Sequence, residues 1–239
     1  MHFSFFTFFS DFVIFQVVKW MFLIFHDFHI SCHISCPTVD ISKFSTVFSF
    51  PRHLLSLASY FTELTEAAAL ENVESGEILS LLLNALYALG ELKKDPALVK
   101  AVFELKLMSL IGFEPLADAC ACCGNPEPED PVLDIREGVI CCGRCGKGER
   151  GLEPSLPPMA STTGPAGRWP ARMPLSPGAL AALRRALYGE AKRLYSFSLA
   201  GPDLKKLGDA GEAYVHAMLE RGFKTLDFYK GLQMQEADG

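Results

Sequence analysis

The first 50 residues contain no Ala, Gly, Glu, Arg or Asn, yet they hold 13 of the chain's 19 Phe. Turns and close packing need glycine and alanine, so this composition is unusual for a folded domain. The charged start and small-residue cleavage site of a secretory signal peptide are missing as well. We therefore interpret residues 1–50 as an atypical Phe-rich segment, and favour a mis-assigned or frame-shifted extension over a membrane segment or a genuine domain.

A membrane segment would have to occupy Phe3–Phe25, which is long enough to cross a bilayer. Asp11 and Lys19 lie inside that stretch, and each charge is costly at membrane depth. These charges argue against a membrane partner. We expect a cytoplasmic, nucleoid-associated location.

Motifs of several enzyme classes are also missing. The chain has no GxxxxGK[ST] and no GxGxxG after a predicted strand, which argues against a nucleotide-dependent enzyme. It lacks the His-x-Glu that zinc deaminases carry upstream of their Cys-x-x-Cys. Beyond residue 50 the only histidines are His53 and His216. The sequence therefore predicts a protein that is not an enzyme.

The net charge of −6 argues against a surface that coats DNA uniformly. The charge is nevertheless unevenly spread along the chain. Residues 52–134 carry 5 basic and 14 acidic side chains, whereas residues 161–232 carry 11 basic and 6 acidic ones. A basic face in the second region could bind phosphate or an acidic peptide. Ordinary solvated helix charges are the alternative explanation.

Apolar residues at helical spacing predict a mainly α-helical body after Pro51. The predicted helices cover 52–68, 75–92 (the most apolar, expected at the centre), 95–113, 176–197, 202–223 and 224–232. Asp95 and Ser176 each precede a proline, an arrangement typical of a capped helix start, and Gly112 suits a helix end. Residues 151–174 are predicted as a loop. Strand patterns are confined to 131–135 and 138–142.

Two Cys-x-x-Cys pairs, separated by 18 residues, predict a zinc ribbon. Cys120 and Cys123 form the first pair, and Cys142 and Cys145 form the second. Four thiolates satisfy zinc completely and leave no open coordination position, so the predicted Zn²⁺ is structural and not catalytic.

Further cysteines lie outside this pattern. Cys122 and Cys141 fall between the predicted ligands and are expected to be bystanders. The repeat HISCHISC at 29–36 also offers metal-binding side chains, but its biased surroundings favour a chance duplication.

These patterns divide the chain into five parts. They are the atypical segment 1–50, the first part of a helical domain at 51–119, and an inserted four-cysteine zinc ribbon with a little β-structure at 120–149. The second part of the helical domain follows at 150–232, and 233–239 is predicted to be a disordered tail.

The order of these parts resembles the C-terminal part of bacterial RecO, a family of DNA repair and recombination mediators. The resemblance rests on FELKLMSLIGFEPLADACACCG, GVICCGRC, PLSPGALAALRRAL and KTLDFYKGL, and runs from about Leu54 to Leu232. The four selected cysteines stand where zinc-binding members carry theirs. We expect the family's N-terminal OB-fold to be missing or replaced here, because residues 1–50 lack the turns and strand alternation of a five-stranded barrel.

The resemblance implies a mediator that binds single- and double-stranded DNA and anneals complementary strands. With RecR it would help to load RecA onto DNA coated by single-strand-binding protein. The missing OB-fold could impair these activities. A membrane-tethered helical zinc-ribbon adaptor without a repair role is the alternative if residues 3–25 span a bilayer.

The family's helical domain is also implicated in binding the acidic tail of single-strand-binding protein. Carboxylates of such a tail pair with arginine and lysine. The candidate residues for this surface, or for DNA, are Arg184, Arg185, Lys192 and Arg193 on one predicted helix, together with Lys205 and Lys206.

Overall fold

The computed structural model describes residues 51–68, 75–146, 170–199 and 201–237. The interpretations of residues 1–50, including the membrane segment and the HISC repeat, lie outside these ranges. Within them the fold is mainly helical and carries one small sheet, as predicted. No helix in the described ranges is long and apolar enough to cross a membrane.

The elements follow the predicted order closely. The helices are α2 (Arg52–Ala68), α3 (Ser75–Gly90), α4 (Pro96–Leu110), α5 (Gly143–Gly146), α6 (Pro177–Tyr188), the 3₁₀ turn η2 (Ala191–Arg193), α7 (Gly201–Leu219) and α8 (Lys224–Ala237). The strands are β1 (Val132–Asp134), β2 (Val139–Cys141) and β3 (Arg172–Pro174), in the sheet order β2-β1-β3 with both pairings antiparallel.

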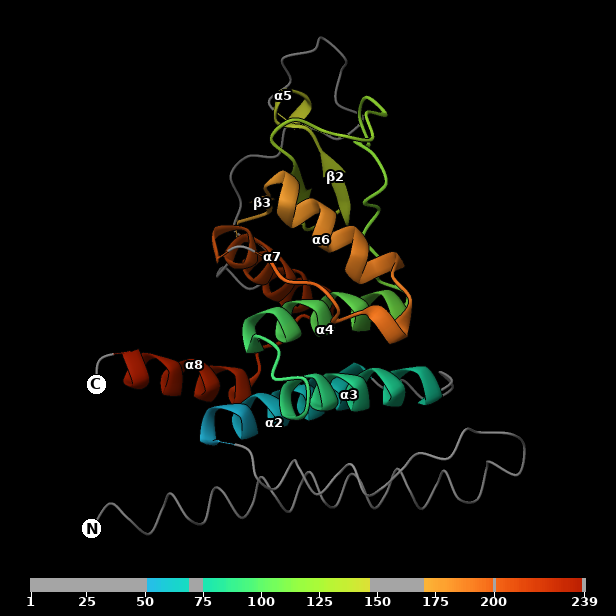
Figure 1. Cartoon of the computed structure of the whole chain (residues 1–239). Coiled ribbons are helices and arrows are strands. Elements are labelled where there is room, and N and C mark those ends of the chain that lie inside the picture. Colours follow the sequence, from blue (N-terminus) through green and yellow to red (C-terminus); the bar gives the residue numbers. More distant parts are fainter. Residues whose placement is uncertain (1–50, 69–74, 147–169, 200, 238–239) are drawn as a thin grey trace.

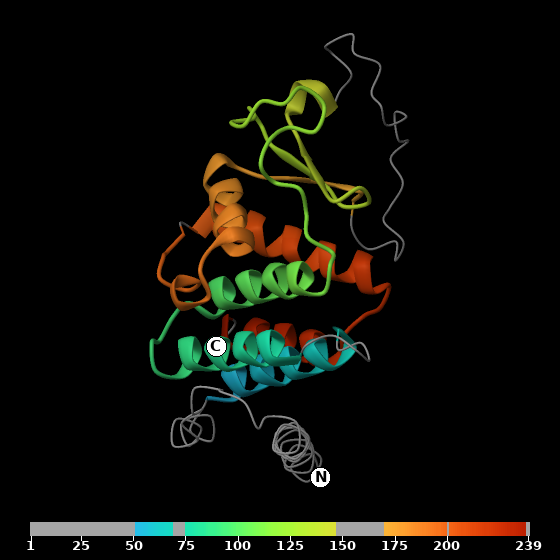
Figure 2. The same cartoon turned by 90° about the vertical axis from the view of Figure 1, so that its right-hand side faces the viewer.

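The helices form stacked layers with the sheet at one end (Figures 1 and 2). Helices α2, α3 and α8 make the layer farthest from the sheet, and α4 lies above them. Helices α6 and α7 cover the other side of α4, and the sheet with α5 projects beyond them. The cysteine-rich segment is therefore an outgrowth of one end of a helical body.

Local sequence explains where two of these helices begin. The carboxylate of Asp95 accepts the N–H of Ala97 at 2.9 Å, and the hydroxyl of Ser176 accepts the N–H of Ala179 at 3.2 Å. Each cap precedes a proline in the first turn, where a missing N–H costs nothing. Gly112, with φ of +91°, ends the α4 region in a conformation that favours glycine. These three predictions are confirmed.

The central helix is α4, which corrects the expectation for residues 75–92. Helix α4 packs against α2, α3, α6 and α7, and its residues 98–105 are all buried. The ring of Phe103 stacks on Phe61 of α2 with centroids 4.3 Å apart. The sequence pattern misplaced the centre because α4 includes Lys100 and Glu104, whose charges made it look less buried than α3.

Those charges belong to a buried network that joins four helices. The Lys100 Nζ lies 2.8 Å from Glu104 Oε1 and 3.1 Å from Glu212 Oε2 of α7. Tyr60 of α2 donates its hydroxyl to Glu104 Oε1 at 2.6 Å, and Lys230 of α8 pairs with Glu212. Burial raises the pKa of Glu104, whereas Lys100 and Lys230 hold the pKa of Glu212 below its usual value despite burial.

Several boundaries differ from those predicted, including the ends of α6 and α8 and the added strand β3. Helix α6 ends at Tyr188, because the backbone turns extended at Gly189, where a Cβ would lie 2.3 Å from the Arg185 carbonyl oxygen. The predicted loop 151–174 ends in strand β3, whose pairing with β1 is a long-range contact. Helix α8 continues to Ala237, so the predicted disordered tail is helical over residues 233–237.

Candidate metal centre

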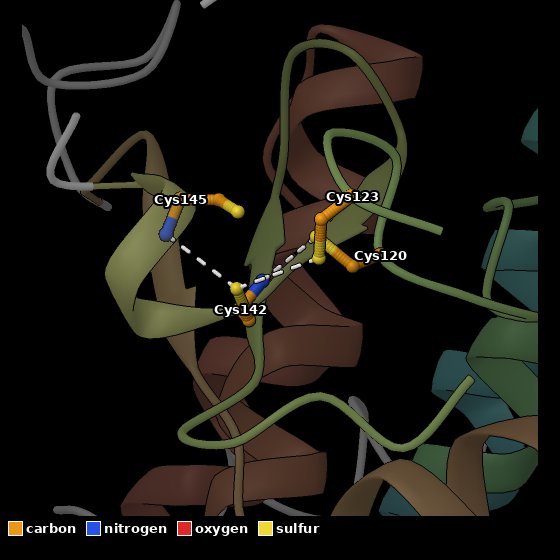
Figure 3. Close-up of side chains that lie close together, drawn as sticks. All are labelled: Cys120, Cys123, Cys142 and Cys145. Carbon is orange, nitrogen blue, oxygen red and sulfur yellow. Dashed lines mark hydrogen bonds between the residues drawn. The ribbon is translucent and has the colours of Figure 1, made fainter. Parts of the chain in front are cut away.

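Four cysteine side chains converge at the end of the outgrowth (Figure 3). This end, residues 118–130 and 142–146, is called the tip below. The sulfur atoms of Cys120, Cys123, Cys142 and Cys145 all lie within 4.8 Å of one another. Two come from the turn before β1, one directly follows β2, and one lies in α5. The structure thus brings together the four residues that the spacing selected.

Backbone geometry explains why these sulfurs meet. The N–H of Gly124 donates to the carbonyl of Cys120 at 2.8 Å, and Gly124 has φ of +70°, which turns the chain back over the sulfurs. The N–H of Cys142 points to the sulfur of Cys120 at 3.2 Å, and the N–H of Cys145 points to the sulfur of Cys142 at 3.4 Å. Such N–H donors stabilise thiolates.

The cysteines of the cluster differ in how readily their thiols ionise. Burial opposes ionisation of Cys120, but the backbone N–H groups of Cys142, Cys123 and Cys122 outweigh it and lower the pKa of Cys120 to about 6. The pKa of Cys145 is raised, because its thiol hydrogen-bonds to Cys142 and because it is buried. A bound cation would favour the ionised form of each of these thiols.

The donor set fits a tetrahedral soft metal. In a zinc site with four cysteine ligands the sulfurs stand about 3.8 Å apart, because each lies ~2.3 Å from the metal. Sulfurs within 4.8 Å of one another need only a small contraction to reach that geometry. Among the described residues the cluster contains only cysteines, without histidine or carboxylate. The arrangement is therefore compatible with a closed metal site.

The base of this outgrowth is part of the main core. Leu133 pairs with Ile140 across β1 and β2, and both are completely buried in the same apolar cluster as the helices. Leu116 bonds to the carbonyl of Gly138 at 2.7 Å and to the N–H of Ile140 at 3.1 Å. The cysteines, by contrast, form a separate small cluster. A metal bound by the cysteines would therefore add packing at the tip and not in the main core.

Arg184 fastens the tip to helix α6. Its guanidinium donates to the carbonyls of Ala117 at 2.7 Å and Asp118 at 3.0 Å, to the carbonyl of Pro126, and to the carboxylate of Glu127 at 3.1 Å. These acceptors flank the first Cys-x-x-Cys on both sides. The sequence offered no signal for this role, because the contacts join residues that are 57 to 67 positions apart.

We expect Arg184→Met to loosen the tip by about 1.5–3 kcal/mol, since it deprives several carbonyls of a charged donor. Methionine keeps the apolar stem and removes the planar donor group. Hydrogen exchange of the amides at 117–127 should become faster while those of α4 keep their protection. Arg144→Met removes only an exposed pair with Glu129 and is the matched control. Unchanged exchange in Arg184→Met would show that the contacts do not stabilise the tip.

The other predicted binding residues do not lie on one helix. Arg185 is in the last turn of α6, stacks 4.9 Å above the ring of Phe197 and donates to Ser196 at 2.9 Å. Lys192 and Arg193 lie on η2, beyond the break at Gly189. The expectation of a single helix is thus wrong, although Arg185 and Arg193 are both exposed.

Lys205 and Lys206 lie near the opposite end of α6. They are exposed residues of α7 and follow Asp203, which bonds to Ser176 at the first turn of α6. Lys205 pairs with Asp209 at 2.8 Å. The six predicted residues therefore do not form one surface. Arg184 binds the tip, a second group lies at the C-terminal end of α6, and a third lies near its N-terminal end.

Comparison with known proteins identifies one matching family and several similar proteins. Residues 52–162 match the family described as "Recombination protein O C terminal". "DNA repair protein RecO" of Acetivibrio thermocellus is 25% identical over 178 residues, which cover 74% of this chain and 63% of that protein. The protein of the same name from Symbiobacterium thermophilum is 30% identical over 186 residues, covering 75% and 64%. The corresponding protein of Anaeromyxobacter dehalogenans is 32% identical over 168 residues, covering 70% and 58%. The chain spans less than two thirds of the length of each relative.

Proposed function

We propose that the chain belongs to the RecO family and that the protein acts in DNA repair and recombination. The observation that carries the proposal is the agreement between the family match over 52–162 and relatives that are named for DNA repair. We propose more specifically a mediator that binds DNA and single-strand-binding protein, acts with RecR, and supports RecA loading and strand annealing.

The proposed metal is a structural Zn²⁺ held by Cys120, Cys123, Cys142 and Cys145. An all-cysteine donor set supports this choice, because thiolates prefer zinc to magnesium or calcium. When bound, the ion would supply packing to the tip and no reactive water. The absence of histidine and carboxylate from the cluster supports a role that is not catalytic.

The proposed binding surface is the C-terminal end of α6, where Arg185 and Arg193 are exposed. Positive side chains there suit DNA phosphates or the carboxylates of an acidic tail. Lys205 and Lys206 form a second basic site near the other end of α6 and are proposed to extend the contact. Arg184 is left out of the test, because its variants would also disturb the tip.

Strand annealing by the full chain tests the proposed function directly. We expect the wild-type protein to accelerate pairing of complementary oligonucleotides and to bind single-stranded DNA with an affinity that falls as salt rises. Annealing no faster than that of the free strands, together with no DNA binding, would overturn a DNA-repair role for this chain.

Charge reversal tests the surface. The double variant Arg185→Glu with Arg193→Glu should weaken binding of DNA and of the acidic tail peptide, and lower the salt slope by about 2, one for each lost phosphate contact. Arg52→Glu with Lys93→Glu changes the net charge equally at two exposed sites, one at the start of α2 and one between α3 and α4, and should bind as wild type. Equal losses in both variants would point to overall charge and contradict the assigned surface.

A further inference from the structure

Two cysteines beside the metal centre face each other. The sulfurs of Cys122 and Cys141 lie 3.7 Å apart, and neither belongs to the group of four. The side chain of Cys122 is partly exposed, whereas Cys141 is 7% exposed. The pair therefore combines an accessible thiol with a buried partner at contact distance, an arrangement that the bystander role assigned from sequence does not require.

We propose that Cys122 and Cys141 are a redox-sensitive modification site, in which the two thiols oxidise to a disulfide while the four neighbouring cysteines keep their metal. The inference goes beyond the proposed DNA-repair role and uses only residues of the cysteine-rich tip. In this proposal four of the six clustered cysteines bind the metal and the other two form the disulfide.

The backbone places the pair for this reaction. The N–H of Ala121 donates to the carbonyl of Ile140 at 2.8 Å, so the segment before Cys122 runs alongside strand β2. Cys122 directly follows Ala121 and Cys141 directly follows Ile140, so this hydrogen bond holds the two cysteines near each other. A disulfide requires the sulfurs to approach to about 2.05 Å, and rotation of two side chains from 3.7 Å can supply that change.

The chemistry balances with a hydroperoxide as oxidant. The sulfur of Cys122, as the more accessible one, attacks a peroxide oxygen, becomes a sulfenic acid and releases one water when the oxidant is hydrogen peroxide. The sulfur of Cys141 then displaces the hydroxyl of that sulfenic acid as a second water. Two thiols and one hydrogen peroxide become one disulfide and two waters. A low-molecular-weight thiol reverses the step by thiol–disulfide exchange.

The disulfide would tie the two metal-binding turns together. Cys122 lies directly beside Cys123, and Cys141 lies directly beside Cys142. Loss of a metal from four cysteines requires the two turns to separate, and a covalent link next to both keeps them at high effective concentration. We therefore expect the oxidised tip to release its metal several-fold more slowly to a chelator.

The test uses the zinc-loaded full chain and hydrogen peroxide, followed by alkylation and tryptic mapping. Cleavage after Lys106, Arg136 and Arg144 separates fragment 107–136, with Cys122, from fragment 137–144, with Cys141. We expect these fragments to appear linked at an unchanged ratio of zinc to protein. The link should disappear in Cys122→Ser and in Cys141→Ser, both of which should still bind zinc.

Two results would overturn the proposal. The first is zinc release in step with the first disulfide, since that means the ligands are the reactive thiols. The second is a link between the fragments that persists in either serine variant, which would assign it to other cysteines. Neither result depends on annealing activity, so the outcome is separate from that of the proposed function.

Discussion

Replacing Cys142 by serine is expected to abolish tight zinc binding and to unfold the tip around α5, while the helical body stays folded. Serine keeps the size of the side chain and an acceptor for the N–H of Cys145. It does not supply the soft thiolate that zinc prefers. The variant therefore removes a metal ligand with little other change.

The effect should be large because the tip has almost no packing of its own. Its cysteines form a small cluster separate from the main core, and α5 is only four residues long. Structural zinc contributes about 10–16 kcal/mol of apparent binding free energy in zinc-finger peptides, where the metal replaces a core. The helices instead bury an extended apolar cluster that includes Leu133 and Ile140 at the base of the outgrowth.

The measurement is zinc content after gel filtration, together with limited trypsin digestion and circular dichroism. We expect no bound zinc, rapid cleavage at Arg144, and a helical signal close to that of the wild type. Cys122→Ser is the matched control and should retain zinc and resist cleavage. Full zinc content in Cys142→Ser would contradict the assigned ligand set.

Replacing Lys100 by methionine is expected to lower the free energy of unfolding by about 3–5 kcal/mol, the usual cost of breaking a buried ion pair by removing one partner. Lys100 is 7% exposed, and its ammonium lies between the carboxylates of Glu104 and Glu212. Methionine fills a similar volume but leaves Glu104 with the hydroxyl of Tyr60 as its remaining donor. Glu212 keeps Lys230.

Urea unfolding followed by circular dichroism measures this loss. Lys93→Met alters an exposed lysine near the start of α4 and should cost little. Adding Glu104→Gln to Lys100→Met should recover part of the loss, because it removes the stranded charge. A double variant less stable than Lys100→Met would show that the carboxylate of Glu104 is not the source of the cost.

The same network makes stability depend on alkaline pH. Burial would lower the pKa of Lys100, but Glu104 and Glu212 raise it above its usual value. The pKa of Tyr60 is also raised, first by burial and then by the charge of Glu104. A raised folded-state pKa gives stability that is complete below the unfolded value, about 10.4 for lysine and 10 for tyrosine, and is lost as pH rises further. The fall in stability as the pH rises above about 10 should be shallower in Lys100→Met.

Much of the helical body could be predicted because its signals are local. The caps at Asp95 and Ser176 and the helix end at Gly112 each depend on residues that are close in sequence. The break at Gly189 was missed, although glycine was visible there, because the apolar spacing continues past it. Strand β3 was missed because three residues carry little pattern and its pairing with β1 is long-range.

Among the candidate site residues, the cysteines could be predicted from local spacing, whereas the role of Arg184 could not. Two Cys-x-x-Cys pairs select four ligands by spacing alone, and their sulfurs lie within 4.8 Å of one another. The charge of Arg184 indicated a binding residue, yet its donors are taken by the backbone around the first pair. Charge does not tell whether an arginine faces solvent or fastens two parts of a fold.

The sequence by itself determined the helical class, the four candidate metal ligands and the resemblance to a known family, because each depends on spacing or on residue order. Tertiary structure alone decided that α4 is central, that the basic residues separate into distinct groups, and that Cys122 faces Cys141. The physical reason is that burial, ion pairing and thiol contact are set by segments that meet only after folding. A charge such as Lys100 becomes a core residue once Glu104 and Glu212 surround it.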